Sequence, residues 1–555
     1  MPTKIRPAYF LLLAFYVLLT HGIVLFNYGF FWDGWTISPN LLKKNDWEVV
    51  WKIYHDSGRP IYFYIQLFTT FFENTLLGYR LIFIWSIQLT TYSTYRLWQI
   101  LRFPSNTAWL LAIFSTSFPA FLVGFEVIQL PNVVTYSFFM SATWLFISAI
   151  YHKQEIHLKA LKSIQLILSL ILYTASFDTN SLLVYFYPFW ALSFITSICN
   201  KNQNFFSKNT AIHLLFFLFP VLWWALNRYY FPTVGLYANY NQFDISKLGI
   251  NSLIFILFSG IVPMVESVTL FIRLPLLFLP VLAIILIIAF SFKRNFIGSP
   301  IIDVQYPTKQ TLILLCFGVI LFVMGAFPYL AVGKFPIFRS WETRHAMLTL
   351  LPMSIMIVSG IQLLQNKFGA KQTKLINIFI IFLLTSFSAR HIENYLMWQA
   401  RWIKDSTFMT HLLHNANASL FSTYYVQDEW HIEDHSLLYK YDSEYEFYEY
   451  AGMFRLIWGD QSRLGLDLKA ADWQEQQHLV EQDAHYRTGE YNLAGFDPAR
   501  QCKATLILSK TDTRSDMKIA LDYIVNQIVN PDLNKQPLTK LSTLEVIPHP
   551  DNRCL

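Results

Sequence analysis

Long apolar segments recur along the first three quarters of the chain and limit its possible folds more than any other feature. Runs of about 20 apolar residues, each long enough to cross a bilayer as a helix, can be placed at eleven positions. Because lipid cannot satisfy exposed backbone polar groups, we predict a polytopic α-helical membrane protein. The predicted spans lie near residues 8–28, 76–98, 106–124, 133–151, 161–177, 180–199, 211–231, 274–292, 311–332, 345–364 and 375–396.

Composition and charge support this class and divide the chain into two parts. Of the 555 residues, 54% are hydrophobic and 14% are charged, which is unlike a soluble protein of this length. Up to Trp398 there are 27 Lys and Arg against 13 Asp and Glu, and from Gln399 onward 15 against 23. The basic part suits cytoplasmic loops, whereas the acidic part gives no reason to expect a nucleic acid partner.

The positions of Lys and Arg predict the orientation of the spans. Basic residues collect in alternate loops, which become cytoplasmic if the N-terminus is cytoplasmic. The apolar stretch Leu248–Arg273 contains Glu266, and counting it as a span would move the basic pair Lys293 and Arg294 to the outside. We therefore predict that this stretch lies along the outer interface, and that residues 1–398 form the membrane domain.

The remaining residues, 399–555, are predicted to form one α/β domain on the outer side of the membrane. Strands are expected at Ser422–Val426 and Ala504–Ser509, and an amphipathic helix at Asp516–Ile528. Cys502 and Cys554 could pair in an oxidising compartment. Short loops and one Asn417-Ala418-Ser419 sequon favour a bacterial inner membrane, with this domain in the periplasm.

The first outer loop, residues 29–75, carries two unusual groups of polar residues. It opens on Phe31-Trp32-Asp33-Gly34-Trp35, where the tryptophans could simply anchor the interface, or Asp33 could act as a general base for a lipid-borne substrate. His55-Asp56-Ser57-Gly58-Arg59-Pro60 then precedes an apolar helix. Pro60 suits the first helical position, whereas the helix dipole disfavours a cation such as Arg59 at this end. An anion such as phosphate, bound by Arg59 and the free N–H groups of the helix, would explain why an Arg stands there.

The last outer loop and two shorter loops add further ionisable residues. Phe338-Arg339-Ser340-Trp341-Glu342-Thr343-Arg344-His345 places two Arg and a His at a membrane surface, which phosphate binding or contacts with lipid headgroups and Glu342 would explain. Glu126 and Asp178 are acids in apolar surroundings. In the tail, His431 and His435 have the spacing of helical zinc ligands without a known zinc signature. The run Tyr441–Tyr450 is expected to be structural, although its rings could hold sugars.

An acid directly after the first span, a long outer loop and Gly-Arg-Pro before an apolar helix resemble the type C glycosyltransferase superfamily. The likeness extends over most of the chain at the level of overall plan. It implies transfer of a sugar from a polyprenyl-phosphate carrier, with inversion, to a glycan, lipid or protein acceptor at the outer face. It also implies that Asp33 is the catalytic base. The candidates for binding the donor phosphate are Arg59, Arg339, Arg344 and His345. The candidates for binding the substrate or a metal are Asp56, Glu126 and Asp178.

The metal requirement and two other functions stay open at this point. Asp33 and Glu126 could share a divalent cation such as Mg²⁺ or Mn²⁺, but the pattern departs from the paired acids of metal-dependent members. An O-antigen ligase or polymerase would depend more on outer-loop Arg and His. A transporter or lipid flippase should carry ionisable residues within its spans, for which Arg80 and Arg96 are candidates.

Overall fold

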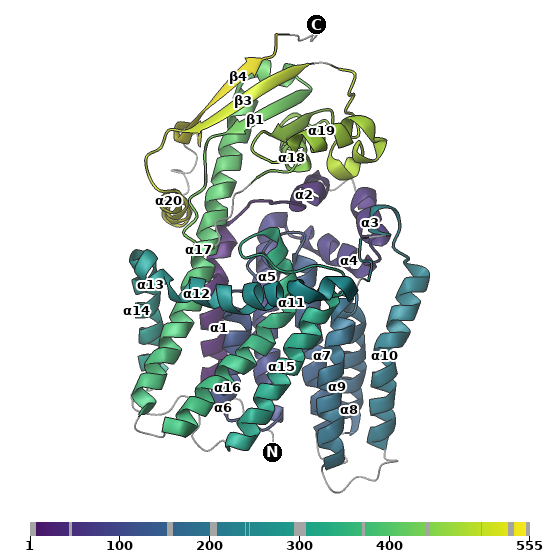
Figure 1. The fold of residues 1–555 in the computed structure, drawn as a ribbon, viewed down its shortest axis with the longest axis vertical. Helices are drawn as coiled ribbons and strands as arrows, with labels where there is room; N and C mark the ends of the chain where they lie inside the picture. Colours follow the sequence, from purple (N-terminus) through teal and green to yellow (C-terminus); the bar gives the residue numbers. More distant parts are fainter. Residues whose placement is uncertain are drawn as a thin grey trace.

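A bundle of long helices forms one end of the molecule, and a small α/β domain forms the other end (Figure 1). The computed structural model describes residues 7–43, 47–151, 159–199, 208–238, 240–243, 245–292, 307–368, 372–438, 444–500, 502–530 and 538–550. Each of the eleven predicted apolar segments contains a helix. These helices are α1 (Pro7–His21), α5 (Thr75–Ile100), α6 (Ser105–Ser117), α7 (Leu130–Tyr151), α8 (Lys159–Ser176), α9 (Ser181–Cys199), α10 (Lys208–Tyr230), α14 (Pro275–Phe292), α15 (Thr308–Leu330), α16 (Leu350–Phe368) and α17 (Thr373–His414).

Seven helical segments within the described residues are long and apolar enough to cross a membrane. Six of them coincide with predicted spans, and the seventh is Gly249–Arg273. A polytopic membrane protein is thus supported by helix length and hydropathy, whereas the number of eleven spans stays a prediction.

The segment Gly249–Arg273 runs across the end of the bundle, although its length and hydropathy would suit a span (Figure 1). It consists of α11 (Gly249–Ile256), a π-helical turn (Leu257–Ile261), α12 (Val262–Val268) and α13 (Leu270–Arg273). The Glu266 carboxylate in α12 accepts the backbone N–H of Leu437, at 2.8 Å, from the C-terminal domain. The buried acid Glu266 thus has partners that lipid could not supply, while the predicted location of this segment at the outer interface stays a prediction.

Three short helices of the first loop lie between the bundle and the C-terminal domain (Figure 1). They are α2 (Gly34–Lys43), α3 (Trp47–Asp56) and α4 (Pro60–Thr69). The first loop therefore contacts both the helix bundle and the C-terminal domain.

The C-terminal domain contains one mixed sheet of four strands in the order β2-β1-β3-β4. Strand β1 (Thr423–Asp428) is parallel to β2 (Leu464–Asp467) and to β3 (Lys503–Lys510), which pairs antiparallel with β4 (Ser542–Pro548). The helices of this domain are α18 (Phe447–Trp458), α19 (Trp473–Gln482) and α20 (Asp516–Val529). Both predicted strands and the predicted helix are confirmed. The segment from His431 to His435 is not helical, so its two imidazoles lack the helical spacing expected of zinc ligands.

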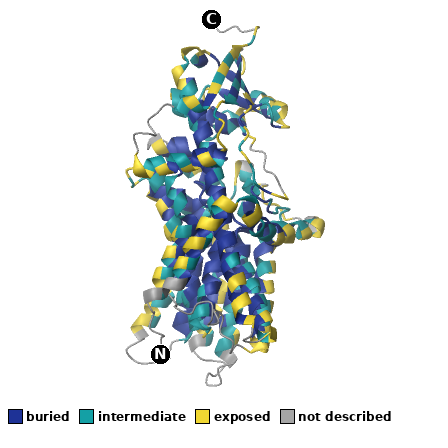
Figure 2. Ribbon diagram, turned by 90° about the vertical axis from the view of Figure 1, so that its left-hand side faces the viewer, coloured by how far each residue is buried: buried dark blue, intermediate teal, exposed yellow. Residues whose placement is uncertain are grey.

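The helix α17 continues without a break for 42 residues through residue 399, where the sequence predicts the boundary between the two domains. A helix of that length extends about 60 Å, twice the hydrocarbon thickness of a bilayer. Buried residues run from the bundle into the C-terminal domain (Figure 2), and Trp35, Trp398 and Tyr450 belong to one hydrophobic core. The two parts therefore form one packed body. Cys502, next to β3, is disulfide-bonded, and its predicted partner Cys554 lies outside the described residues.

Candidate active site

A cavity of about 380 Å³ lies where the first loop, the start of α9 and the loop before α16 meet. Four of the eight predicted site residues line it, although they come from three separate parts of the sequence. These four are Asp33, Arg59, Arg344 and His345. Other polar side chains in its wall include Tyr54, Tyr62, Asn132, Asn180, Tyr237 and Lys334.

The backbone just before Asp33 is held from two sides. Phe31 donates its N–H to the Glu126 carboxylate at 3.0 Å, and Trp32 donates its N–H to the Glu449 carboxylate at 2.9 Å. Trp32 has a φ of +49°, a left-handed conformation that bulky residues rarely adopt. Two buried carboxylates, one from the bundle and one from the C-terminal domain, thus maintain the strained turn that presents Asp33.

Glu126 was predicted to be a ligand for substrate or metal, but its side chain lies away from the cavity. It is fully buried, does not line the cavity, and also accepts the N–H of Val127. A carboxylate engaged by two backbone amides does not fit a cation shared with Asp33. Within the described residues, no three His, Cys, Asp or Glu side chains form a group that could hold a metal. Glu126 therefore acts in this structure as an anchor for the first loop.

The acids that anchor this turn make stability depend on pH. Burial raises the pKa of Glu126 to about 8 and that of Glu449 to about 7, against 4.5 for an ordinary glutamate. Between pH 5 and 8 the native state therefore binds more protons than the unfolded state, and stability is expected to fall as pH rises. We expect a lower unfolding midpoint in detergent at pH 8 than at pH 5.5. An unfolding midpoint that rises from pH 5.5 to pH 8 would contradict the raised pKa values of Glu126 and Glu449 in the native protein.

Gly34 lies so close to Glu126 that no larger residue fits. A Cβ added at Gly34 would stand 2.1 Å from Oε1 of Glu126. Gly34→Ala is therefore expected to displace the anchor and to lower stability by about 1–3 kcal/mol, measured as a reduced unfolding midpoint. Gly360→Ala is the matched control, because a Cβ there meets no atom within 4 Å and alanine favours a helix. Equal midpoints for the two variants would argue against this contact.

Arg59 stands at the start of α4 with Pro60 at the first helical position, as predicted. The Asp178 carboxylate accepts the N–H of Tyr62 at 3.1 Å and so satisfies the start of this helix from another loop. Asp178 does not line the cavity, so its predicted role at the substrate is replaced by helix capping. The Arg59 guanidinium lies 5.4 Å from the centre of the Tyr62 ring and makes no hydrogen bond or ion pair with any described residue.

Arg344 and His345 share one acidic neighbour, Glu342. Arg344 Nη2 lies 3.2 Å from Glu342 Oε1, and His345 Nδ1 lies 2.8 Å from Glu342 Oε2. Lys334, which sequence reasoning missed, also reaches the cavity and lies over the ring of Tyr240. Burial, followed by the charges of nearby arginines, lowers the pKa of Lys334 to about 7. Sequence reasoning could have found Lys334 because it lies in the same loop as Arg339 and Arg344.

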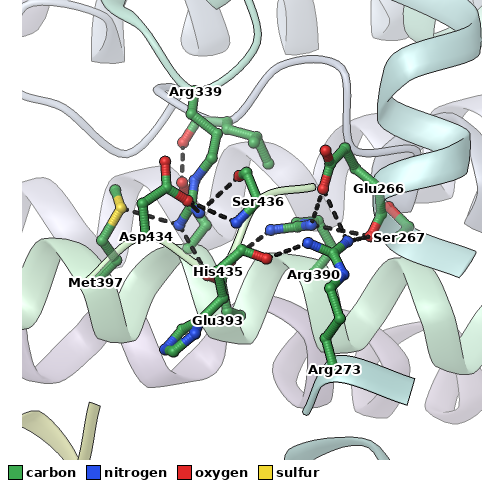
Figure 3. A network of polar contacts seen from close by, with 12 residues as sticks. Glu266, Ser267, Arg273, Arg339, Arg390, Glu393, Met397, Asp434, His435 and Ser436 are labelled. Carbon is green, nitrogen blue, oxygen red and sulfur yellow. Dashed lines mark hydrogen bonds and ion pairs between the residues drawn. The ribbon is translucent and has the colours of Figure 1, made fainter. Parts of the chain in front are cut away.

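Arg339, unlike the other predicted phosphate ligands Arg59, Arg344 and His345, does not line the cavity. Its side chain is fully buried. Nη2 lies 2.8 Å from Glu393 Oε1, and Nη1 forms an ion pair with the Asp434 carboxylate (Figure 3). The network continues through Arg390, which bridges Glu393 and Glu266 at 2.9 Å each. Arg273 pairs with Glu266 at 2.8 Å, so three arginines balance three acids. The network ties the loop that carries Arg344 to α12, α17 and the C-terminal domain.

Asp56 also lies away from the cavity wall. Its carboxylate is 3.2 Å from His55 Nδ1, and its carbonyl accepts the N–H of Val234. The neighbouring carbonyl of Gly58 accepts the side-chain amide of Asn227 at 3.0 Å. This part of the first loop therefore rests on the end of α10.

A second hollow of about 620 Å³ adjoins the cavity. The side formed by α9 and α10 is lined mainly by Leu183, Val184, Tyr187, Pro220, Val221 and Trp224, while Arg228, Thr233 and Gln242 add polar groups to its wall. Both hollows include Arg59, Asn180 and Tyr237 in their walls. Arg59 thus stands where the cavity meets this groove.

The assembled site combines one accessible carboxylate with several cations beside a groove whose α9–α10 side is mainly apolar. Asp33 can accept a proton, while Arg59, Lys334 and Arg344 can bind an anion whose apolar tail follows α9 and α10. No protein-family model, no curated protein and no solved structure matches the chain.

Proposed function

We propose that the protein is a membrane glycosyltransferase of the type C superfamily. It would move a sugar from a polyprenyl-phosphate carrier to a glycan, lipid or protein acceptor at the outer face of the membrane. The observation that supports this most is the position of Arg59, a guanidinium without an ion-pair partner among the described residues, between the cavity that Asp33 lines and a groove with one mainly apolar side. A lipid phosphate has the same two parts, an anionic head and an apolar chain.

In the proposed reaction Asp33 removes the proton from an acceptor hydroxyl as that oxygen attacks the anomeric carbon of the donor sugar. The bond between this carbon and the phosphate oxygen breaks, and the phosphate leaves with the electron pair. Arg59, Lys334 and Arg344 would stabilise the negative charge that grows on the leaving phosphate. Attack opposite to the leaving group inverts the anomeric centre, and Asp33 returns its proton to water.

The groove between α9 and α10 supports entry of the donor from the side. Val221 and Trp224 are each 53% exposed on the surface of the bundle, although they also line the groove. A polyprenyl chain could therefore remain in contact with lipid while its phosphate reaches Arg59. No step of the proposal requires the lipid to leave the membrane.

The structure offers less support for a transporter. Arg80, a candidate for an ionisable residue of a translocation path, donates to the carbonyls of Asn27 and Gly29 at 2.8 Å each. Its guanidinium is fully buried and thereby satisfies the turn that follows the first span. Arg96 lies over the ring of Trp144 near the end of α5. Neither arginine lines the cavity or the groove.

The test is transfer by purified protein reconstituted in liposomes with radiolabelled undecaprenyl- and dolichyl-phosphate sugars. Glycan, lipid and peptide acceptors would be supplied in separate reactions. We expect label to move from the lipid fraction to one acceptor class, with release of one equivalent of polyprenyl phosphate. Label that crosses the bilayer while still bonded to the lipid would instead identify a flippase.

A further inference from the structure

The C-terminal domain contacts the proposed base directly. Tyr448, in the first turn of α18, donates its hydroxyl to Asp33 Oδ1 at 2.9 Å across 415 positions of sequence. Within the described residues, no other side chain is hydrogen-bonded to this carboxylate. The second oxygen, Oδ2, thereby stays available to the cavity.

The turn that carries Tyr448 is itself fixed to the first loop. Glu449 Oε2 accepts the N–H of Trp32 and pairs with Arg401 Nη2, at 2.9 Å each, while Oε1 accepts the N–H of Glu446 at 3.3 Å. The reciprocal bonds of Glu446 and Glu449 form a capping box at the start of α18. The position of the Tyr448 ring is therefore set by the same contacts that hold the backbone of Asp33.

The hydroxyl of Tyr448 also keeps its proton. Burial, followed by the negative charges of Asp33 and Glu446, raises the pKa of Tyr448 well above its usual value. The hydroxyl therefore donates to a carboxylate throughout the range in which Asp33 could act as a base. A donated hydrogen bond favours the ionised carboxylate and restricts its rotation.

We infer that Tyr448 is a positioning residue for Asp33 and that the C-terminal domain completes the active site. The inference rests on the proposed function. With Oδ1 held by Tyr448, the carboxylate presents Oδ2 to the acceptor hydroxyl in one orientation, so less ordering remains when the acceptor binds. The domain is thus a part of the catalytic centre in addition to any role in recognising acceptors.

Docking of the domain does not depend on this hydrogen bond. A Cβ at Gly452 of α18 would lie 3.1 Å from the carbonyl of Trp35, which shows close backbone packing between the domain and α2. Arg455 of the same helix donates to Asn40 of α2 at 2.8 Å. Removal of a single hydroxyl should therefore affect Asp33 without releasing the domain.

The test compares Tyr448→Phe with Tyr491→Phe in the liposome transfer assay. Tyr491 is the matched control, because its ring lies 6.2 Å from that of Tyr448 and its hydroxyl has no hydrogen bond to a described residue. For Tyr448→Phe we expect kcat to fall by about 10- to 100-fold, with the donor KM within about twofold of wild type. The unfolding midpoint should match that of Tyr491→Phe.

Each other outcome has a distinct meaning. Transfer by Tyr448→Phe at the wild-type rate overturns the inference while the proposed function stands. A loss of rate with an unfolding midpoint lowered below that of Tyr491→Phe assigns Tyr448 to domain docking and also overturns it. If the wild-type protein transfers no sugar from any donor, the proposed function itself fails.

Discussion

Replacing Asp33 by Asn is expected to abolish sugar transfer, with a fall in kcat of about 10³-fold or more. The amide keeps the shape of the carboxylate, and its oxygen can still accept the hydroxyl of Tyr448. It cannot take a proton from the acceptor, so the variant removes general-base catalysis, which typically contributes about 10²- to 10⁴-fold. Because the backbone contacts of Phe31 and Trp32 are unchanged, donor binding should stay near that of wild type.

Asp56→Asn is the matched control for this variant. It makes the same chemical change in the same loop, at a carboxylate that pairs with His55 and does not line the cavity. Transfer by Asp56→Asn is expected within about twofold of wild type, and both variants are compared by initial rates of label transfer. If Asp33→Asn retains more than a tenth of the wild-type rate, Asp33 is not the base.

The elements that sequence predicted well are those determined by local pattern. Apolar length alone located α1, α7 and α15, because a helix in lipid must be apolar over most of its length. Alternating and helical periodicity located β3 and α20 within about two residues. The continuity of α17 could not be predicted this way, because its polar second half is buried by tertiary contacts with the C-terminal domain.

The candidate site was predicted in part, since sequence shows which ionisable residues are present and not which of them neutralise each other. Arg339 and Arg344 are five residues apart in one loop, yet Arg339 pairs with Glu393 and Asp434 while Arg344 lines the cavity. Glu393 lies within a predicted span and gave no sign of such a partner. Pairing across the fold therefore decides which charges remain for a ligand.

Glu126 and Asp178, two acids predicted to bind the substrate, accept hydrogen bonds from backbone amides. Tyr448 of the C-terminal domain contacts the proposed base Asp33, which the sequence did not predict. Glu126 holds the N–H of Phe31, and Asp178 holds that of Tyr62, so both serve parts of the first loop. Such capping by a distant side chain leaves no local sequence signature. Residues Phe447–Tyr450, part of the run that was expected to be structural, form the start of α18, and one ring of that helix, Tyr448, contacts Asp33.

Replacing Arg59 by Met is expected to weaken donor binding by about 10- to 100-fold, seen as a rise in the donor KM. Hydrogen bonds to a charged group contribute about 1.5–3 kcal/mol each, and about 1.4 kcal/mol corresponds to a factor of ten. The effect should exceed that of Arg344→Met, because the charge of Arg344 is already offset by Glu342 at 3.2 Å. Arg59→Lys should recover part of the loss, since it restores the charge without the planar fork.

The measurement is the donor KM in the liposome assay, together with binding of polyprenyl phosphate that carries no sugar. Lys367→Met serves as the control, because it removes one positive charge near the end of α16, outside the walls of the cavity and the groove. It should leave the donor KM unchanged. Equal donor affinity in Arg59→Met and wild type would show that the phosphate binds elsewhere, and would remove the principal support for a lipid-phosphate donor.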